Sequence, residues 1–256
     1  MYKDNTNSEP MKGEFTIKWL CSTDSTNNEI LRHACDLDNL SVIAAREQTA
    51  GRGQRGNRWK SAAGENLTFS AFVRFGESPL PVLPASRQFA ISQAATLAVA
   101  NLLRSKGIYA RIKWPNDIYC GDKKICGMLI ENRLKGGDVD FSVIGIGLNV
   151  RQRQFDPDLM NPTSMSLITG EDYVLEPLLE EICKALFDNL LKLGTLTPQY
   201  LDLLYRKGEL RSYTDVESGE VFRGTIKGIS EEGMLLVEMP EGCVREFGFK
   251  EISYIL

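Results

Sequence analysis

The sequence predicts an α+β fold in which helices pack on a mixed or antiparallel sheet and a small β-barrel follows at the C-terminal end. Three observations support this prediction. Runs of β-branched and aromatic residues recur between residues 15 and 150 and include a hairpin across Gly121-Asp122-Lys123. A long apolar helix is expected over residues 85–106. Beyond residue 210, short strand-like runs alternate with glycine turns, a spacing typical of a small barrel.

The composition is that of an ordinary folded protein with a sizeable core. Of the 256 residues, 43% are hydrophobic and 25% charged, and a chain of this length fits one large domain or a domain with a small appendage. The formal net charge of −4 gives no general attraction to nucleic acid. No uninterrupted apolar run reaches the roughly 18 residues that suggest a membrane span. Residues 1–14 lack the apolar core of a signal peptide and are expected to form a polar lead-in.

Cysteine and histidine usage narrows the possible classes of catalytic site. The six cysteines show no CxxC or metal-like spacing and are expected to be small buried side chains in a reducing cytoplasm. His33 is the only histidine, and its expected place is on a helix beside Arg32. A Ser-His-Asp triad or a multi-histidine metal site would depend on this one residue. The chain therefore carries no obvious nucleophile of its own.

In the first half of the chain we expect three strands and two helices. A strand over residues 15–20 leads into a helix, and Thr26 has capping-box spacing to Glu29, which makes Thr26 the expected N-cap. The elements that follow are expected at residues 41–48 and 66–75, both strands, and at residues 85–106, a helix buried against the sheet.

In the second half, Pro115 is expected to interrupt the pairing of a strand over residues 109–117. A strand over residues 141–150 carries Gly145 and Gly147, where a ligand or another backbone segment can come close. The remaining expected elements are a hairpin of residues 118–120 and 124–131, amphipathic helices over residues 176–193 and 198–207, and strands over residues 224–229, 234–239 and 244–249. The change to short, regularly spaced strands places a domain boundary near residue 210.

Residues 49–59 form the most informative segment. Three glycines and three arginines occupy the eight positions from Gly51 to Arg58, and Trp59 closes the run. Glycine lets a backbone approach a ligand closely, arginine forms bidentate contacts with carboxylate or phosphate, and a tryptophan face can stack on a base. The loop joins two strands, whereas Walker-type and dinucleotide-binding loops open a helix. It is an anion-binding loop or, on the plainer interpretation, a solvated basic surface loop.

Four segments, in this order, resemble the biotin protein ligases. They are Ser25-Thr26-Asn27 at the start of a helix, residues 48–59 with their GRGxRG core, the run Lys113-Trp114-Pro115-Asn116-Asp117, and residues 123–131 with a K-x-x-G pattern; residues 145–149 resemble the late glycine-rich strand of the family. The resemblance spans roughly residues 15–256. It implies the class II synthetase-like catalytic fold of biotin and lipoate ligases for residues 15–210 and an SH3-like β-barrel for residues 211–256.

The resemblance implies a two-step ligase reaction. Biotin and ATP, with Mg²⁺, form biotinyl-5′-adenylate and pyrophosphate; the acyl group then passes to a lysine on a biotin carboxyl carrier protein or domain, and AMP is released. The acceptor supplies the nucleophile, which agrees with the missing triad, so the enzyme's tasks are positioning and charge stabilisation. The resemblance further implies a cytoplasmic enzyme without a membrane partner, and it leaves monomer and homodimer both open.

The sequence departs from the bifunctional bacterial ligases at two points. It begins almost at the catalytic domain, with no room for their DNA-binding helix-turn-helix, so the resemblance is to the monofunctional type and we expect no DNA binding and no repressor function. Gln54 stands where many bacterial members have an arginine, so one charge-assisted contact to carboxylate or phosphate is missing. A main-chain contact at Gln54 is still expected, and the effect of Gln54 on retention of the adenylate is left open.

Residue roles carry over from the family position by position. Arg52 and Lys124 are expected to be the catalytic residues, close to the carboxylate and acyl-phosphate oxygens. The residues expected to bind biotin are Ser25, Thr26, Asn27, Gln48, Arg52, Gly53, Gln54 and Lys124, the first four at the ureido ring. The residues expected to bind ATP or the adenylate are Arg55, Arg58, Trp59, Lys113, Asn116, Asp117 and Asn149, and Asp117 is also the candidate metal ligand. The alternatives are core packing for Trp114 and a surface charge at a strand end for Lys113.

Two other functions are kept open. A lipoate or octanoate ligase shares the same catalytic fold, but its site must admit a long apolar chain and has no ureido group to bind. The polar residues Ser25, Thr26, Asn27 and Gln48 fit a ureido group better. Against an apolar chain they would be buried without partners, at a cost of about 1–3 kcal/mol for each unpaired group. A non-catalytic binder, either a biotin sensor or a nucleotide-binding module, is the alternative from another class.

Overall fold

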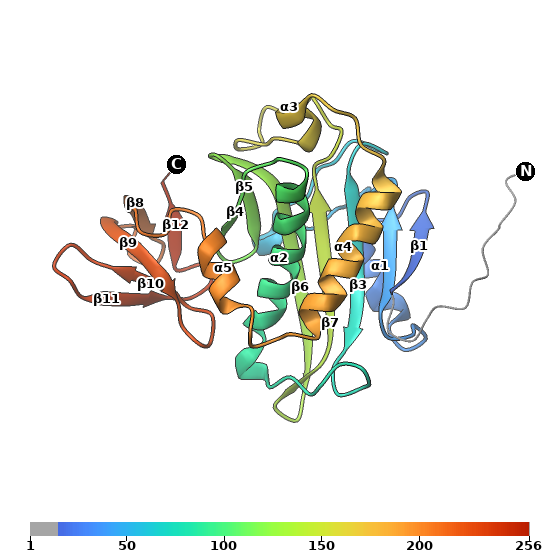
Figure 1. The fold of residues 1–256 in the computed structure, drawn as a ribbon, viewed down its shortest axis with the longest axis horizontal. Coiled ribbons are helices and arrows are strands. Elements are labelled where there is room, and N and C mark those ends of the chain that lie inside the picture. Colours follow the sequence, from blue (N-terminus) through green and yellow to red (C-terminus); the bar gives the residue numbers. More distant parts are fainter. Residues whose placement is uncertain (1–14, 256) are drawn as a thin grey trace, which may run out of the picture.

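A mixed seven-stranded sheet forms the centre of the molecule (Figure 1), in the computed structural model that describes residues 15–255. Its strand order is β1-β2-β3-β7-β6-β5-β4. The strands are β1 (Thr16–Leu20), β2 (Ser41–Ala45), β3 (Leu67–Arg74), β4 (Ala110–Lys113), β5 (Asp117–Cys120), β6 (Lys123–Lys135) and β7 (Asp138–Leu148). β1 and β2 run parallel, and the other neighbouring pairs run antiparallel. The predicted α+β class with a mixed sheet is confirmed.

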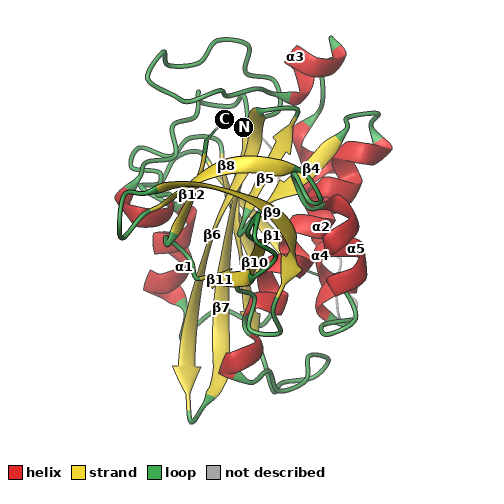
Figure 2. Cartoon of the chain, turned by 90° about the vertical axis from the view of Figure 1, so that its left-hand side faces the viewer, coloured by secondary structure: helices red, strands yellow, loops and turns green. Residues whose placement is uncertain are grey.

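The helices lie on both faces of this sheet. They are α1 (Thr26–His33), α2 (Phe89–Ser105), α3 (Met165–Thr169), α4 (Leu175–Leu190) and α5 (Thr197–Leu203), with the 3-10 turns η1 (Gln54–Gly56) and η2 (Ala85–Arg87). α2 and α4 run side by side against one face, and α1 lies on the other (Figure 2). α2 is buried along most of its length, as its apolar sequence predicts, and Gly107 follows it with a φ of +78°. No helix within residues 15–255 is both long and apolar enough to cross a membrane.

Side chains alternate between the two faces of the sheet along its strands. On β3, Phe69 packs in the main core with α2, whereas Phe72 packs with Ile30 of α1 on the opposite face. The same alternation turns Gly127 and Gly147, which are register partners on β6 and β7, toward the α1 face. Because glycine has no side chain, the α1 face is hollow at this point.

A second, five-stranded antiparallel sheet follows in the order β11-β10-β9-β8-β12. Its strands are β8 (Leu210–Asp215), β9 (Val221–Ile229), β10 (Leu235–Glu238), β11 (Val244–Phe247) and β12 (Ile252–Tyr254). The three predicted tail strands correspond to β9, β10 and β11, whereas β8 and β12 lie outside the predicted elements. Trp114 joins the two sheets, because its indole N–H donates to the Gly233 carbonyl at 2.9 Å and its ring packs against Phe249.

Two expectations from the sequence need correction. Thr26 is not the N-cap of α1: Ser25 has the extended backbone of that position, with φ −159° and ψ 134°. Thr26 begins the helix and turns its hydroxyl to Gln48, so a partner from a distant segment replaces the local capping bond. The strand expected over residues 109–117 is a tight hairpin instead, because the turn around the proline ends β4 at Lys113 and starts β5 at Asp117.

Candidate active site

A cavity of about 280 Å³ opens on the α1 face, between the two sheets. Its volume lies just below the roughly 300–1,000 Å³ of typical small-molecule sites. The lining comes from the start of α1, the loop of residues 48–59, the β4–β5 turn, the glycine-rich parts of β6 and β7, and β12. Its charged residues are four cations, Arg52, Arg58, Lys113 and Lys124, and one carboxylate, Asp117. This excess of positive charge suits an anionic ligand.

The structure brings nearly all the predicted ligand-binding residues to this cavity. Those that line it are Ser25, Thr26, Asn27, Gln48, Arg52, Gly53, Gln54, Arg58, Trp59, Lys113, Asn116, Asp117 and Lys124. Asn149 lies elsewhere: it is buried, and its side-chain amide donates to the Thr163 carbonyl at 2.9 Å. The side chain of Arg55 lies outside the described part of the structure. Which ligand group each lining residue binds stays a prediction.

One part of the cavity is a cluster of neutral polar side chains. The side-chain carbonyl of Gln48 accepts hydrogen bonds from the Thr26 amide at 2.8 Å and the Thr26 hydroxyl at 3.1 Å. The buried Ser70 hydroxyl of β3 lies 2.7 Å from Thr26 Oγ1 and 2.5 Å from Asn27 Oδ1. Ser70 is not among the residues predicted from the sequence, where its signal is a small polar residue at the centre of a strand that is otherwise mostly apolar. Ser70 fixes two side chains that are expected to contact the ligand.

Asn27 is held against β6 and β7. Its Nδ2 donates to the Leu129 carbonyl at 3.2 Å and to Glu131 at 2.8 Å. Its Oδ1 occupies the space above Gly145, where a Cβ would lie only 2.1 Å away. The sequence predicts that a ligand or a backbone segment comes close to this glycine, and the structure places a polar side chain there. Gly145 is therefore required for the position of Asn27.

The glycine–arginine loop is a small hairpin. Gly53 N donates to the Asn57 carbonyl at 2.8 Å, and the 3-10 turn η1 forms its tip. Ala50 N donates to the Asp24 carbonyl at 2.9 Å, which fixes the base of the loop to the segment before α1. The loop therefore has a defined backbone next to the start of α1.

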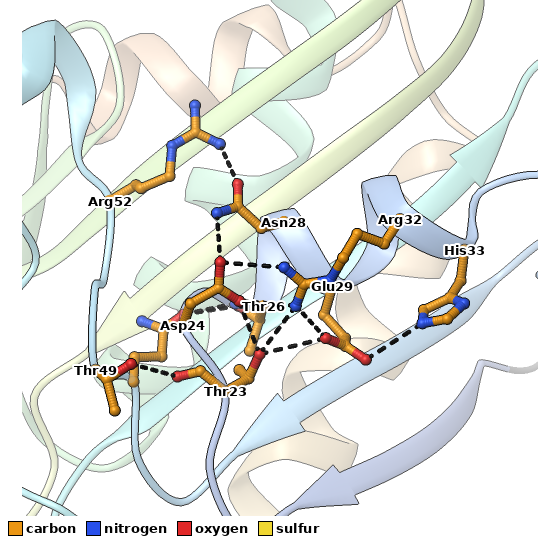
Figure 3. Close-up of polar contacts among 10 residues, drawn as sticks. Thr23, Asp24, Thr26, Asn28, Glu29, Arg32, His33, Thr49 and Arg52 are labelled. Carbon is orange, nitrogen blue, oxygen red and sulfur yellow. Dashed lines mark hydrogen bonds and ion pairs between the residues drawn. The ribbon is translucent and has the colours of Figure 1, made fainter.

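A network of charged and amide side chains supports this loop (Figure 3). The Arg52 guanidinium donates to Asn28 Oδ1 at 2.8 Å, and Asn28 donates to the Asp24 carboxylate at 2.8 Å. Arg32 pairs with the same carboxylate at 2.7 Å. The hydrogen bonds that Asp24 accepts from Arg32 and Asn28 hold the pKa of its carboxyl group well below the usual range, so this carboxylate stays ionised. Arg52 also pairs with Glu131 at 2.8 Å and is thus held between α1 and β6.

Trp59 lies across the two glycines that hollow the sheet. A Cβ on Gly147 would lie 2.3 Å from its ring, and a Cβ on Gly127 would lie 3.2 Å from it. The indole N–H is buried and has no hydrogen-bond partner among the described residues. A buried donor without a partner costs about 1–3 kcal/mol, so an acceptor on a ligand at this point would be favoured.

Lysines and one carboxylate form the cationic wall of the cavity. Lys124 Nζ lies 2.7 Å from Asp117 Oδ1. Lys113 Nζ lies 3.1 Å from the Tyr119 hydroxyl and over the Tyr119 and Tyr254 rings, 4.6 and 4.8 Å from their centres. Burial lowers the pKa of Lys113 to about 8, although Asp117 opposes the shift. Lys113 is thus a half-buried cation of the cavity rather than a surface charge at a strand end.

The second sheet contributes directly to the cavity, which the sequence does not predict. Ile252, Ser253 and Tyr254 of β12 line it. Trp114, only 4% exposed, packs between the two sheets, as the core-packing alternative predicts, and also lines the cavity. The site therefore depends on both sheets.

Residues 19–149 match the model of the biotin/lipoate A/B protein ligase family. The chain belongs to this family. A family relative, the bifunctional ligase/repressor BirA of Salmonella typhimurium, is 32% identical over 241 residues, which cover 90% of this chain and 71% of that protein. A biotin–[acetyl-CoA-carboxylase] ligase of Paracoccus denitrificans is 29% identical, over 87% of this chain and 94% of that protein.

A solved member of the biotin/lipoate ligase family shares the fold along nearly the whole chain. The biotin protein ligase of Aquifex aeolicus in complex with biotin and ATP matches with a TM-score of 0.74 and 26% identity, covering 93% of this chain and 97% of that one. The chain is thus an enzyme of the ligase class and a family member of the biotin protein ligase type.

Proposed function

We propose that this ligase uses ATP to attach biotin to one lysine of a biotin carboxyl carrier protein or domain of a biotin-dependent carboxylase. The reaction passes through biotinyl-5′-adenylate and releases pyrophosphate and then AMP. The supporting observation is one cavity that combines a neutral polar cluster, at Thr26, Asn27 and Gln48, with four cations. Biotin has matching groups, a neutral ureido ring and a carboxylate. All six cysteines are free, in keeping with a cytoplasmic location. Their expected burial is wrong for Cys21, Cys35 and Cys243, which are exposed.

The charges of the cavity suit the adenylation step. The biotin carboxylate and the ATP phosphates must approach each other, and fixed positive charge offsets their repulsion. Lys124, which pairs with Asp117, is expected to bind the carboxylate of biotin. One oxygen of the biotin carboxylate attacks the α-phosphorus of ATP, and pyrophosphate leaves. In the transfer step the amine of the carrier lysine attacks the acyl carbon, and AMP leaves. Binding and orientation by the cavity are the enzyme's share of both steps.

Mg²⁺ would be held by Asp117 together with phosphate oxygens of ATP. Asp117 is the one carboxylate in the described lining of the cavity. Nowhere in residues 15–255 do three histidine, cysteine or acidic side chains gather into a metal site of their own. One protein carboxylate with substrate phosphates is a common way of binding Mg²⁺. The residues therefore fit an ion that arrives with ATP and neutralises part of its charge.

ATP–pyrophosphate exchange with biotin, lipoate or octanoate as the added acid tests the proposal. Exchange with biotin alone would support it, and biotin transfer to a purified carrier domain would then complete the reaction. Exchange with lipoate or octanoate would instead make the chain a ligase for those acids. No exchange with any of the three acids, in folded protein, would favour a non-catalytic binder.

A separate measurement of retention on DNA, over a range of salt concentrations, checks the expected absence of a repressor role.

We expect Gly145→Ala to raise the KM for biotin by about tenfold or more. The added Cβ would lie 2.1 Å from Asn27 Oδ1, so the Asn27 amide must leave its place and its expected contact with the ureido group is lost. Exchange kinetics at saturating ATP measure this KM. In the control Gly228→Ala the new Cβ meets only Leu201, at 3.4 Å, and the KM should not change. An unchanged KM in Gly145→Ala would remove Asn27 from the biotin site.

The KM for ATP is expected to rise by about tenfold as the pH increases from about 7 to about 9.5. A rise of this size is expected because one charged hydrogen bond to ATP is lost. Lys113, expected to bind ATP, has a pKa of about 8 and loses its charge in this range. An ordinary lysine would stay protonated up to about pH 10. Lys113→Arg keeps its charge throughout and should give a nearly constant KM. A wild-type KM that is independent of pH would contradict the role of Lys113.

A further inference from the structure

Glu131 lies at the edge of the cavity, where β6 continues beyond the lining residues. Its carboxylate touches two residues of the site. Oε2 accepts a hydrogen bond from Asn27 Nδ2 at 2.8 Å. The Arg52 guanidinium binds both oxygens, with 2.8 Å from Nη2 to Oε1 and 3.1 Å from Nη1 to Oε2. One carboxylate therefore joins α1, which carries Asn27, to the loop that carries Arg52.

Each of these contacts orients a planar group. A charged acceptor on Nδ2 fixes which side of the Asn27 amide is the donor and which is the acceptor. Bidentate pairing fixes the plane of the Arg52 guanidinium, which also donates to Asn28 at 2.8 Å. Without the Glu131 carboxylate, Asn27 retains the Leu129 carbonyl at 3.2 Å and the Ser70 hydroxyl at 2.5 Å, and Arg52 retains Asn28. Both orientations would then be less strictly defined.

The plainer interpretation is an ordinary surface ion pair. The side chains of Arg52 and Glu131 are 40% and 28% exposed, and such pairs contribute about 0–1 kcal/mol to stability. That interpretation does not account for the third partner, because Asn27 is 3% exposed and donates both amide hydrogens to β6. The pair of Arg46 and Glu176 has similar exposures of 39% and 41%. In the described chain no side-chain amide joins the Glu176 carboxylate, which makes this pair a matched control.

We propose that Glu131 is a positioning residue that couples recognition of the ureido group, through Asn27, to the orientation of Arg52 in the carboxylate-binding loop. This inference rests on the proposed function. A ureido group bound to Asn27 favours the amide orientation that Glu131 also favours, and Glu131 in turn holds Arg52. An acid without a ureido group lacks this link, so Glu131 contributes to the selection of biotin over simple fatty acids.

Biotin dissociation constants, measured by titration calorimetry, test the coupling in a double-mutant cycle. The four chains are the unaltered protein, Asn27→Ala, Arg52→Ala and the double variant. Each single variant raises the biotin dissociation constant by some factor. If Glu131 couples the two side chains, the factor for the double variant should be about tenfold smaller than the product of the two single factors. In a Glu131→Gln background the two effects should multiply to within about twofold. In a Glu176→Gln background the coupling should persist.

Biotinol, which has a primary alcohol in place of the carboxylate, separates the two partners of Glu131. Arg52→Ala should weaken the binding of biotin much more than that of biotinol, because biotinol carries no charge. Glu131→Gln should weaken both ligands, each by about tenfold, because it disturbs Asn27 as well. Its melting temperature should stay within a few degrees of the unaltered protein, so that the weaker binding of both ligands does not come from a loss of the fold.

The outcomes separate this proposal from the proposed function. If the unaltered chain binds biotin and the effects of Asn27→Ala and Arg52→Ala simply multiply, the coupling is overturned and the proposed function stands. If the coupling persists in Glu131→Gln, the link belongs to another residue and the role of Glu131 is overturned. If the unaltered chain binds no biotin, both proposals fall together.

Discussion

Lys124→Ala is expected to slow biotin-dependent ATP–pyrophosphate exchange by about 100-fold to 1,000-fold, the range for removing one donor to a developing oxyanion. Lys124 lines the cavity, and its Nζ lies 2.7 Å from Asp117. It is expected to bind oxygens whose charge changes as the carboxylate joins the phosphate. Because such a contact strengthens in the transition state, the loss should appear mainly in kcat. Steady-state exchange kinetics measure both parameters.

The same substitution should leave the fold nearly unaffected. The side chains of Lys124 and Asp117 are 31% and 24% exposed, and an exposed pair contributes about 1 kcal/mol or less, which corresponds to about 2–4 °C in melting temperature. Lys60→Ala removes a lysine that pairs with Asp156 outside the cavity lining and serves as the control. A loss of stability in Lys124→Ala as severe as the loss of exchange would identify a structural lysine instead.

Arg52→Ala is expected to lower kcat/KM for adenylation by about 100-fold. The variant loses a fixed positive charge at the cavity and also the contacts to Asn28 and Glu131 that hold the loop. In the unaltered protein, biotin and ATP should protect residues 51–58 from protease, because an ordered lid excludes water from a hydrolysable acyl-phosphate. In Arg52→Ala this protection should be much weaker. Exchange kinetics and limited proteolysis with mass analysis measure the two effects.

Arg46→Ala is the matched control for Arg52→Ala. Arg46 pairs with Glu176 and stands outside the cavity lining, so its loss should leave exchange and loop protection near normal. Near-normal activity in Arg52→Ala would contradict the predicted role of the loop and show that the side-chain charge at this position is dispensable.

The strands and long helices of the fold could be predicted because their signals are local. β3, expected at residues 66–75, spans Leu67–Arg74, and the helix expected at residues 176–193 is α4, Leu175–Leu190. The error at Thr26 arises where a local rule competes with a distant partner. Capping-box spacing depends on four consecutive residues, whereas Gln48, which follows β2, decides where the Thr26 hydroxyl points. No local pattern contains that information.

The cavity could be predicted only in part, because local patterns do not contain information on distant partners. Arginine, lysine and glycine motifs identify the segments that meet at the cavity, but they do not show which neighbouring residues orient the side chains of these segments. Ser70 has the sequence context of a buried strand residue. Glu131 is the last residue of the strand that the sequence predicts and precedes polar residues, where a solvated side chain is the default. Asn149 shows the opposite case, because it belongs to a motif but bonds to Thr163 outside the cavity.

The contribution of β12 to the cavity has a consequence for synthesis of the protein. The first lining residue is Ser25, and the last is Tyr254. A ribosome must therefore translate almost the whole described chain before the wall of the site is complete, although the arginine-rich loop emerges early. Until then the nascent chain cannot gain the stability that bound substrates give a finished fold. A chain cut short before β12 would display the loop and the central sheet around a site that lacks one wall.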